Sequence, residues 1–311
     1  MNGVFLTRTF ERTGGRVKYF SHMLRLFTCI ALAGLVCCGR QATPPSNTAI
    51  PQRIISLSPT VTEILYELGL GDRLIADTTL CDYPEDAKNK EKVGDFLSVN
   101  EEKIISLQPD LIIDTTSKSH EKMWERMARA GIRVEHFEID TMDAVYDAYT
   151  GIGKIAGVEE KAAGLVNNLK DGFADLKARG ARAANKPRVL FVVDYENLVL
   201  AGEGTFIDTL LADIGCVNVI ADKGWPGNAS FEVLISLKPD IIIIAVNGKD
   251  LTEEKIKTIK ARWTTAASVP AVANNRILVI NADTATRPGP RLLKGWTETA
   301  KLVHPELFNS P

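Results

Sequence analysis

The chain has 311 residues, of which 45% are apolar and 24% are charged, with 5 cysteines. This composition is that of a globular protein and excludes collagen, a disordered chain and a small disulfide scaffold. The length exceeds what one hydrophobic core requires, so two lobes are expected. Because 37 basic residues nearly balance 39 acidic ones, no basic face is indicated and a nucleic-acid partner is not expected.

Residues 1–37 are predicted to be a lipoprotein-type signal segment. A stretch rich in arginine precedes an apolar run over residues 26–36, which is too short to span ~30 Å of hydrocarbon. The run ends at Cys37 and Cys38, and Cys38 is the expected lipidation site, although a cysteine is unusual directly before the modified one. Met23 is an alternative start. A non-cleaved anchor or a pair of buried cysteines is the competing interpretation.

Residues 38–51 are polar, contain prolines and have no apolar period, so they are predicted to be a flexible tether. With no other stretch long enough to cross a bilayer, the lipid is expected to be the chain's only attachment to a membrane. The chain should therefore be exported, held at a membrane and facing the periplasm or the cell exterior.

The first lobe is predicted over residues 52–150 and begins with a strand and a helix. Residues 53–57 form a β-rich run, and the following segment has a helical apolar period that ends at Gly69. Thr60 and Glu63 fit a capping box for this helix. The second lobe, residues 186–311, opens in the same way, with a strand over residues 188–193 and an amphipathic helix over residues 205–215.

An internal duplication supports two related lobes. Residues 102–113 (EKIISLQPDLII) match residues 232–243 (EVLISLKPDIII) with an offset of 130 positions. Each copy predicts a short helix, a Pro-Asp turn and a strand buried on both faces of a parallel sheet. Helices and strands continue to alternate after each copy, so the predicted fold is α/β, with two Rossmann-like lobes that have parallel sheets.

One long helix is predicted to join the lobes, within an interlobe region at residues 151–185. Residues 159–181 keep a single apolar stripe, which gives a helix roughly 34 Å long. A single helical connection predicts lobes that rock only slightly. A ligand is then expected between the lobes, at the loops that follow the strand ends.

Catalytic signatures are missing from the sequence. Residues 151–156 imitate a dinucleotide fingerprint, but they follow a helical segment where that motif needs a strand. His120, His136 and His304 are widely separated, and no acid or cysteine lies near any of them at metal-ligand spacing. The chain is therefore predicted to be no enzyme and to hold no metal or cofactor. Cys81 and Cys216 could form a disulfide, although buried thiols are the preferred interpretation.

Glu102 and Glu232 occupy equivalent places at the starts of the duplicated helices. Complementing the helix dipole explains them as well as a functional role does. The functional alternative is that each lobe presents one exposed carboxylate to a two-fold partner bearing basic residues, where charge pairs steer and orient the complex.

Aromatic residues in loops are candidates for binding a large flat ligand. Tyr83, Phe96 and Trp225 lie in loops flanked by glycine, proline or aspartate, although each could instead pack into its own lobe. Trp124, Trp263 and Trp296 lie in helical stretches and are predicted to be packing residues. In the rigid segment 283–291, Asp283 and Arg287 could face a polar ligand edge, and Arg291 could simply pair with a neighbour.

The sequence resembles the periplasmic substrate-binding proteins of ABC importers for vitamin B12, haem and iron-siderophores. The resemblance covers roughly residues 53–308. It rests on the blocks RIISLSPTVTEILYELG, CDYPEDA, VGDF-(x)3-NEEKIISLQPDLII, SFEVLISLKPDIIII and RPGPRLL. It implies two lobes that are joined by one long helix and bind the ligand between them. It also implies that one glutamate of each lobe docks to arginines of a permease dimer. At the matching positions these glutamates are Glu102 and Glu232.

Within this family the cobalamin receptors look most similar. Their corrin-contacting positions match Tyr83, Phe96, the Trp225-Pro226 segment and Asp283. Thr115 and Thr286 depart from the pattern, since cobalamin receptors can have a tryptophan and an acid there. A haem receptor would need an axial ligand, which Tyr83 could supply, and a siderophore receptor would tend to have more arginines at the site.

The resemblance therefore implies a lipid-anchored receptor for cobalamin or a related corrinoid. Its expected partners are an ABC permease dimer with its ATPase subunits, and it is expected to act as a monomer. Haem or a ferric siderophore is the alternative ligand. Fold alone does not decide function, so two more remote alternatives stay open. These are a cofactor-carrying enzyme on the same scaffold and an adhesin or sensor domain.

Overall fold

The computed structural model describes residues 49–95, 98–115, 118–227 and 229–308. These residues belong to one compact unit. The predicted signal segment, the lipidation site Cys38, most of the tether and Phe96 lie outside the described residues.

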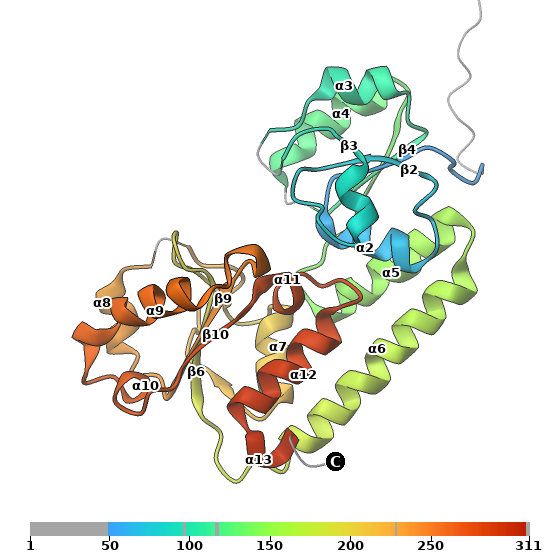
Figure 1. The fold of residues 1–311 in the computed structure, drawn as a ribbon. Coiled ribbons are helices and arrows are strands. Elements are labelled where there is room, and N and C mark those ends of the chain that lie inside the picture. The colour runs from blue at the N-terminus through green and yellow to red at the C-terminus, as the bar shows by residue number, and fades with distance from the viewer. Residues whose placement is uncertain (1–48, 96–97, 116–117, 228, 309–311) are drawn as a thin grey trace, which may run out of the picture. The chain divides into compact units, whose positions relative to one another are not determined.

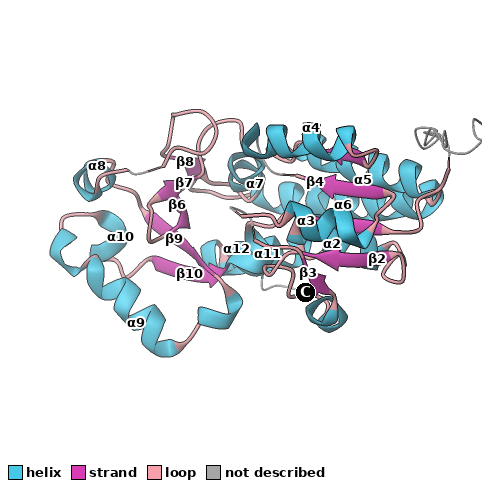
Figure 2. Cartoon of the chain, turned by 90° about the horizontal axis from the view of Figure 1, so that it is seen from above, coloured by secondary structure: helices cyan, strands magenta, loops and turns pink. Residues whose placement is uncertain are grey.

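The first sheet forms the amino-terminal lobe and has five parallel strands in the order β3-β2-β1-β4-β5. Figure 2 shows both lobes from above, with β2, β3 and β4 of this sheet labelled. The strands are β1 Ile54–Ser56, β2 Leu74–Asp77, β3 Glu91–Lys92, β4 Leu111–Asp114 and β5 Arg133–His136. The lobe's helices are α2 Pro59–Glu67, η1 Glu85–Asn89, α3 Glu101–Leu107, η2 Lys118–His120 and α4 Glu121–Arg129. Strands and helices alternate as predicted.

Helix α2 corrects one local prediction. Its N-cap residue is Ser58, which makes no capping hydrogen bond with its side chain. Thr60 therefore lies inside the helix, and the predicted capping box of Thr60 and Glu63 is wrong. Glu63 is instead only 3% exposed, because its carboxylate has a partner in the other lobe. The predicted end at Gly69 is confirmed, since this residue has a φ of 75°, which glycine adopts without strain.

The second sheet forms the carboxy-terminal lobe, with the order β10-β9-β6-β7 and β8 paired to β6. Its strands are β6 Arg188–Asp194, β7 Val199–Leu200, β8 Val217–Asn218, β9 Ile241–Val246 and β10 Ile277–Asn281. All of its pairings are parallel except that of β7, which is antiparallel to β6. The predicted parallel sheet is thus confirmed, and β7 is an added antiparallel edge strand, because the short turn after β6 can join only antiparallel strands.

Helices cover both faces of this second sheet. They are α7 Phe206–Asp213, α8 Phe231–Ser236, η3 Gly248–Asp250, α9 Glu253–Arg262, η4 Thr264–Ala266, α10 Pro270–Ala273, α11 Ala282–Ala285, α12 Leu292–Val303 and α13 Pro305–Phe308. Trp263 and Trp296 are 2% and 0% exposed, which confirms that both are packing residues.

The internal duplication is visible in the backbone. Gln108 and Lys238, 130 positions apart, end their helices with φ values of 46° and 45°. Asp110 then accepts a hydrogen bond from the backbone N–H of Arg53, and Asp240 accepts one from that of Arg188. The guanidinium groups of these two arginines donate in turn to carbonyls at the ends of α3 and α8. The same contacts thus tie helix, turn and first strand together in both lobes.

Helices α5 (Met142–Ala156) and α6 (Glu159–Gly180) lie side by side and connect the lobes (Figure 1). The bounds of α6 agree closely with the predicted helix. Residues 151–156 lie inside α5, so they form no strand-to-helix phosphate turn. Among the described residues, no helix is both long and apolar enough to cross a bilayer.

One hydrophobic core runs through both lobes. Alternate strand residues such as Ile113 and Ile243 pack with α2, α5, α6, α7 and α12 in a single cluster. Their strand neighbours point to the opposite faces and form separate clusters, Ile112 with α3 and α4, and Ile242 with α8, α9 and α10. Both faces of each sheet are therefore buried, as the continuous apolar strands predicted.

Two glycines test the contact between α5 and α6. A Cβ atom at Gly153 would lie 2.3 Å from the Cβ of Ala162, whereas one at Gly164 on α6 would meet nothing within 4 Å. We expect Gly164→Ala to stabilise the protein by up to about 1 kcal/mol, because alanine favours a helix. Gly153→Ala should destabilise it by about 1 to 3 kcal/mol through overpacking. Urea denaturation measures both, and equal effects would contradict the close crossing.

Candidate functional site

The loop that follows β2 carries Tyr83 at the carboxyl edge of the first sheet. Tyr83 is 46% exposed, so its ring is open to a ligand. Lys92 holds the loop in place: its Nζ lies 2.6 Å from Asp77 Oδ1 and donates to the carbonyls of Cys81 and Ala87 at 3.3 and 2.8 Å. One lysine thus ties both ends of the loop to the end of β2.

Asp77 is fully buried beneath this loop. Burial raises the pKa of its carboxyl to about 6, although the hydrogen bond from Lys92 opposes the shift. The second carboxyl oxygen has no hydrogen-bond partner among the described residues. The carboxyl therefore gains a proton more readily in the folded protein than in the unfolded chain.

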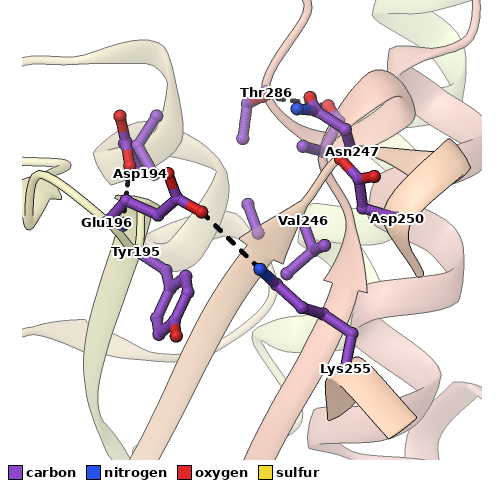
Figure 3. Close-up of a pocket in the computed structure, with 11 residues that line it drawn as sticks. Asp194, Tyr195, Glu196, Val246, Asn247, Asp250, Lys255 and Thr286 are labelled. Atoms are coloured by element: carbon purple, nitrogen blue, oxygen red, sulfur yellow. Dashed lines mark hydrogen bonds and ion pairs between the residues drawn. The ribbon is translucent and has the colours of Figure 1, made fainter. Parts of the chain in front are cut away.

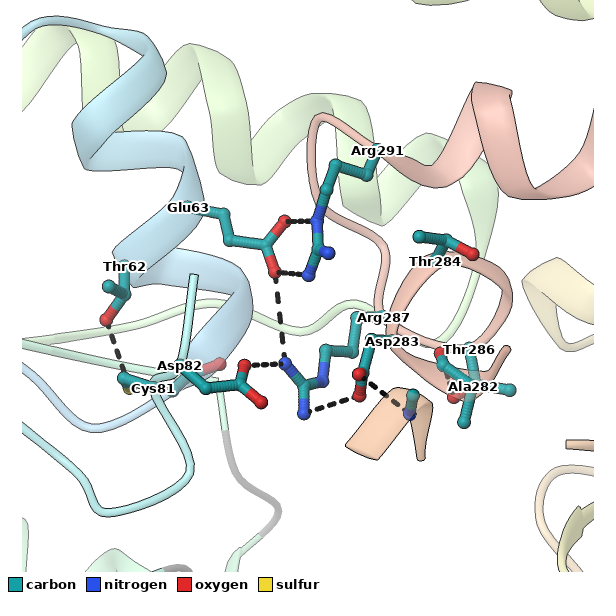
Figure 4. A network of polar contacts seen from close by, with 12 residues as sticks. Thr62, Glu63, Cys81, Asp82, Ala282, Asp283, Thr284, Thr286, Arg287 and Arg291 are labelled. Atoms are coloured by element: carbon teal, nitrogen blue, oxygen red, sulfur yellow. Dashed lines mark hydrogen bonds and ion pairs between the residues drawn. The ribbon is translucent and has the colours of Figure 1, made fainter. Parts of the chain in front are cut away.

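A network of polar side chains links the two lobes, and we call it the interlobe network: Glu63, Asp82 and Tyr83 from the amino-terminal lobe, and Asp283, Arg287 and Arg291 from the carboxy-terminal lobe. Figure 4 shows its five charged members. Arg291 binds Glu63 through two hydrogen bonds of 2.9 and 2.5 Å. Arg287 Nη1 lies 2.8 Å from Asp82, and its Nη2 lies 2.8 Å from Asp283. Both arginines are thus engaged by carboxylates.

The ionisation of the network follows from burial and pairing. Burial raises the pKa of Glu63, while the hydrogen bond from Arg291 acts against it. Burial also acts to raise the pKa of Asp82, but the hydrogen bond and charge of Arg287 outweigh it, and the pKa of Asp82 is lowered. Asp82 is therefore ionised at neutral pH.

Arg291 has a second contact within the interlobe network. Its guanidinium lies 4.0 Å from the centroid of the Tyr83 ring, a cation–π geometry. The guanidinium thus supports one face of the aromatic ring while it pairs with Glu63. Arg291 was predicted to pair with a neighbour, and it does so across the lobes.

Asp283 is 8% exposed, and its Oδ1 forms an ion pair with Arg287 at 2.8 Å without a hydrogen bond. Its Oδ2 accepts a hydrogen bond of 3.0 Å from the backbone N–H of Gly248. A Cβ atom at position 248 would lie 2.9 Å from this carboxylate, so glycine permits the close approach. In this arrangement Asp283 positions Arg287, whose side chain is 18% exposed, against 11% for that of Asp283.

Trp225 makes a separate contact between the lobes. Its indole Nε1 donates to Asp140 at 2.8 Å, and its ring lies 5.6 Å from that of Phe206. The backbone N–H of Phe206 also donates to the carbonyl of Asp140, at 2.6 Å. Trp225 is partly buried, so one part of its ring packs on α7 while the rest stays accessible.

A pocket of about 350 Å³ opens at the carboxyl ends of β6 and β9 (Figure 3). Ala282 and Thr286 line it, so it adjoins the interlobe network. Three acidic residues, Asp194, Glu196 and Asp250, contribute to its wall. Lys255 supplies a positive charge, and its Nζ lies 3.6 Å from Glu196. The lining is therefore acidic on balance.

Glu102 and Glu232 lie in the first turns of α3 and α8, and both are exposed. The two helices begin alike, since the side chain of Asn100 caps α3 and that of Ser230 caps α8. Two apolar side chains on these helices are also exposed, Ile105 by 46% and Val233 by 54%. Each lobe thus presents a carboxylate beside an exposed apolar residue.

Comparison with known proteins decides the family. The family model described as "Periplasmic binding protein" matches residues 54–284. The chain belongs to this family. Its members are substrate-binding proteins and not enzymes, so the chain is an extracytoplasmic substrate-binding protein of ABC transporters, of the class that takes up vitamin B12, haem or siderophores.

Three relatives illustrate the similarity of this binding protein. It is 32% identical over 265 residues to the uncharacterized ABC transporter substrate-binding lipoprotein YvrC of Bacillus subtilis, covering 83% of this chain and 82% of the relative. It is 30% identical over 247 residues to the vitamin B12-binding protein of Photorhabdus laumondii, covering 79% and 85%. The structure of the vitamin B12 binding protein BtuF of Vibrio cholerae superposes with a TM-score of 0.70 at 26% identity, covering 82% and 97%.

The binding protein brings Tyr83, Asp283 and Arg287 into one network, whereas Trp225 contacts Asp140 and α7. Glu63 and Asp82 were missed as members of the site. Asp82 adjoins Tyr83 in the sequence, which is a signal that could have been used. The acidic side of the pocket was missed as well, although Asp194 directly ends a strand, where α/β folds place ligands.

The two residues that depart from the cobalamin-receptor pattern have local roles. Thr115 donates to the hydroxyl of Ser58 at 2.7 Å, after β4. Thr286 lines the pocket and donates to the carbonyl of Ala282 at 2.9 Å.

The described histidines and cysteines of the binding protein make contacts inside the fold and are not among the residues that line the pocket. His120 is 8% exposed, and its Nδ1 lies 2.8 Å from Asp114. The indole of Trp124 donates to the same carboxylate at 2.9 Å. The Nδ1 of His304 lies 3.1 Å from Glu306, so the expectation that no acid pairs with a histidine is wrong for both residues.

Cys81 and Cys216 are both buried and free, which confirms buried thiols over a disulfide. Among the described residues, no group of three or more potential ligands could hold a metal ion.

The raised pKa of Asp77 predicts a pH dependence of stability. Unfolded aspartate has a pKa of ~3.9, so the fold favours the protonated carboxyl. This contribution is complete below pH ~4 and is lost as the pH rises through about 6. We expect the stability of the wild type relative to Asp77→Asn, which does not titrate, to fall by about 2 to 3 kcal/mol between pH 4 and pH 7.

Urea denaturation across this pH range measures the effect. Asp72→Asn, at an exposed position near the start of β2, controls for the loss of one acidic residue. Parallel pH profiles of the wild type and Asp77→Asn would contradict the raised pKa.

Proposed function

We propose that this binding protein is a lipid-anchored receptor that captures cobalamin or a related corrinoid between its lobes and delivers it to an ABC permease. The chain makes and breaks no bond of the ligand. Affinity would come from aromatic contacts and a few fixed polar groups on surfaces formed before binding, so that little free energy is spent on closure.

The observation that carries the ligand proposal is the presentation of Tyr83. Its ring is half exposed, its loop is fastened by Lys92, and its ring is supported by Arg291 from the other lobe. A rigid aromatic surface of this kind suits the flat face of a large macrocycle. The relatives named as vitamin B12-binding proteins support the same class of ligand.

The other proposed ligand-binding residues are Phe96, Trp225, Asp283 and Arg287. Trp225 would add a second aromatic surface where the lobes meet at Asp140. Arg287 would contact a polar edge of the ligand, with Asp283 holding it in position. Phe96 lies outside the described residues and stays a prediction from the sequence.

Haem is a second candidate ligand, and the same residue favours it. An exposed tyrosine can supply a phenolate oxygen as an axial ligand of haem iron, and Tyr83 is exposed by 46%. The two candidates use different parts of the side chain: a corrinoid would use the ring, whereas haem would use the oxygen.

The proposed docking surface consists of Glu102, Ile105, Glu232 and Val233. The carboxylates lie in the first turns of duplicated helices, where they would meet arginines of a permease dimer. The exposed apolar side chains beside them would add contact area that excludes water from these charge pairs.

The lipid would be attached at Cys38, and residues 38–51 would form the tether. The apolar run before Cys38 supports this proposal, as does the similarity to a substrate-binding lipoprotein of Bacillus subtilis. Mass spectrometry of the protein purified from membranes would identify the modified residue.

Substitutions of Tyr83 test the ligand proposal. The purified protein is titrated with cyanocobalamin, cobinamide, haemin and ferric siderophores, and binding is followed by tryptophan fluorescence and calorimetry. We expect both corrinoids to bind and Tyr83→Ala to weaken them about tenfold or more, because the aromatic contact is lost. Tyr83→Phe keeps the ring and should retain corrinoid affinity. Tight haemin binding that Tyr83→Phe abolishes, without corrinoid binding, would reverse the choice of ligand.

Charge reversal tests the docking surface. Glu102→Lys combined with Glu232→Lys should abolish uptake in cells and leave ligand affinity unchanged, because repulsion replaces attraction at the permease. Glu121→Lys and Glu254→Lys serve as a matched control, since both are exposed acids in the first turns of α4 and α9. Loss of ligand affinity in the first pair, or loss of uptake in the control, would show that the docking surface is misplaced.

A further inference from the structure

We infer that Asp82 sets the charge selectivity of this site, because it occupies Arg287 and thereby favours amide-bearing ligands over carboxylate-bearing ones. The inference rests on the proposed function and adds the chemical class of side arm that the site accepts. An arginine that faces a ligand ordinarily attracts carboxylates and phosphates. The selectivity between carboxylate and amide side arms therefore depends on which groups of the protein already pair with Arg287.

Arg287 is held by acids from two lobes. Nη1 lies 2.8 Å from Asp82 Oδ1 and 4.0 Å from Glu63 Oε1, while Nη2 lies 2.8 Å from Asp283 Oδ1. Both terminal nitrogens thus have carboxylate partners before a ligand arrives. A ligand carboxylate would have to displace one of these acids, whereas a ligand amide can accept and donate hydrogen bonds at the edge of the network.

The surrounding charges act in the same direction. In the interlobe network, the three carboxylates of Glu63, Asp82 and Asp283 face the two guanidinium groups of Arg287 and Arg291. The adjoining pocket adds further acids, and its Lys255 is shared with Glu196. The potential at the site is therefore negative on balance, which repels polyanionic ligands and tolerates uncharged or cationic ones.

Asp82 is the member of the network whose removal should alter selectivity with the least damage to the fold. Its side chain is 41% exposed, whereas that of Glu63 is 2% exposed. Loss of Glu63 would leave the partly buried Arg291 without its main partner. Loss of Asp82 leaves Arg287 paired with Asp283, while one side of the guanidinium becomes available to a ligand.

The test compares Asp82→Asn with the wild type, using two corrins that differ only in the groups at the ends of their side arms. One probe is cobyrinic acid, which has carboxylates on its side arms, and the other is the same corrin with amides on those arms. We expect the ratio of the affinity for cobyrinic acid to the affinity for the amide form to rise about tenfold in Asp82→Asn relative to the wild type. Isothermal calorimetry at low ionic strength measures both affinities.

Matched variants separate a local effect from a general change of net charge. Asp86→Asn removes an exposed acid from the same loop and should leave the ratio of the two affinities unchanged. Asp82→Glu keeps the charge and should retain the wild-type ratio. An unchanged ratio in Asp82→Asn, or an equal change in Asp86→Asn, would overturn the inference.

A measurement on the wild type covers the case in which Asp82→Asn fails to fold. Added salt should reduce the discrimination against cobyrinic acid, because the negative potential is screened, and discrimination that is independent of salt would overturn the inference.

If the wild type binds neither corrin, the proposed corrinoid function fails. The charge rule is then tested with haemin and its dimethyl ester, of which the uncharged ester should bind more tightly.

Discussion

A carboxylate buried in the first helix of one lobe requires a cation, and the other lobe supplies it. Glu63 would be costly to bury alone, and its two hydrogen bonds with Arg291 offset that cost only while the lobes stay in contact. Removing one partner of a buried pair typically costs about 3 to 5 kcal/mol. This pair therefore fixes where the segment before α12 meets α2, and with it the position of every residue in the interlobe network.

The same pair connects stability with recognition. Arg291 supports the ring of Tyr83, and Arg287, four residues earlier in the chain, bridges Asp82 and Asp283. The surface that we propose for the ligand is thus an aromatic ring beside arginines that are paired with carboxylates. Such a surface provides contact area and hydrogen-bonding edges without a strong attraction for anions.

The hydrophobic core explains why the lobes can act as one body. The inner faces of both sheets pack on α5, α6, α7 and α12 in one continuous cluster. The helices α3 and α8, which carry Glu102 and Glu232, lie on the outer faces, where separate clusters hold them to their own sheets.

The sequence by itself determined the features that depend on neighbouring residues. Alternating strands and helices, the duplicated segments, the long helix α6 and the exposure of Glu102 and Glu232 all follow from local period, capping and turn residues, and the structure agrees with them. Tyr83 and Arg287 could be chosen as candidates because they lie in short segments rich in proline or glycine.

Only the tertiary structure decided what these residues contact. Glu63 and Arg291 are 228 positions apart, and Asp82 and Arg287 are 205 apart; no local pattern encodes such pairs. The spacing of Thr60 and Glu63 fits a capping box, but in the fold Glu63 is buried and pairs with Arg291 of the other lobe. The antiparallel strand β7 and the pairing of His120 with Asp114 likewise depend on the path of the chain in space. Local sequence limits backbone conformation, but long-range charge pairing depends on which segments the fold brings together.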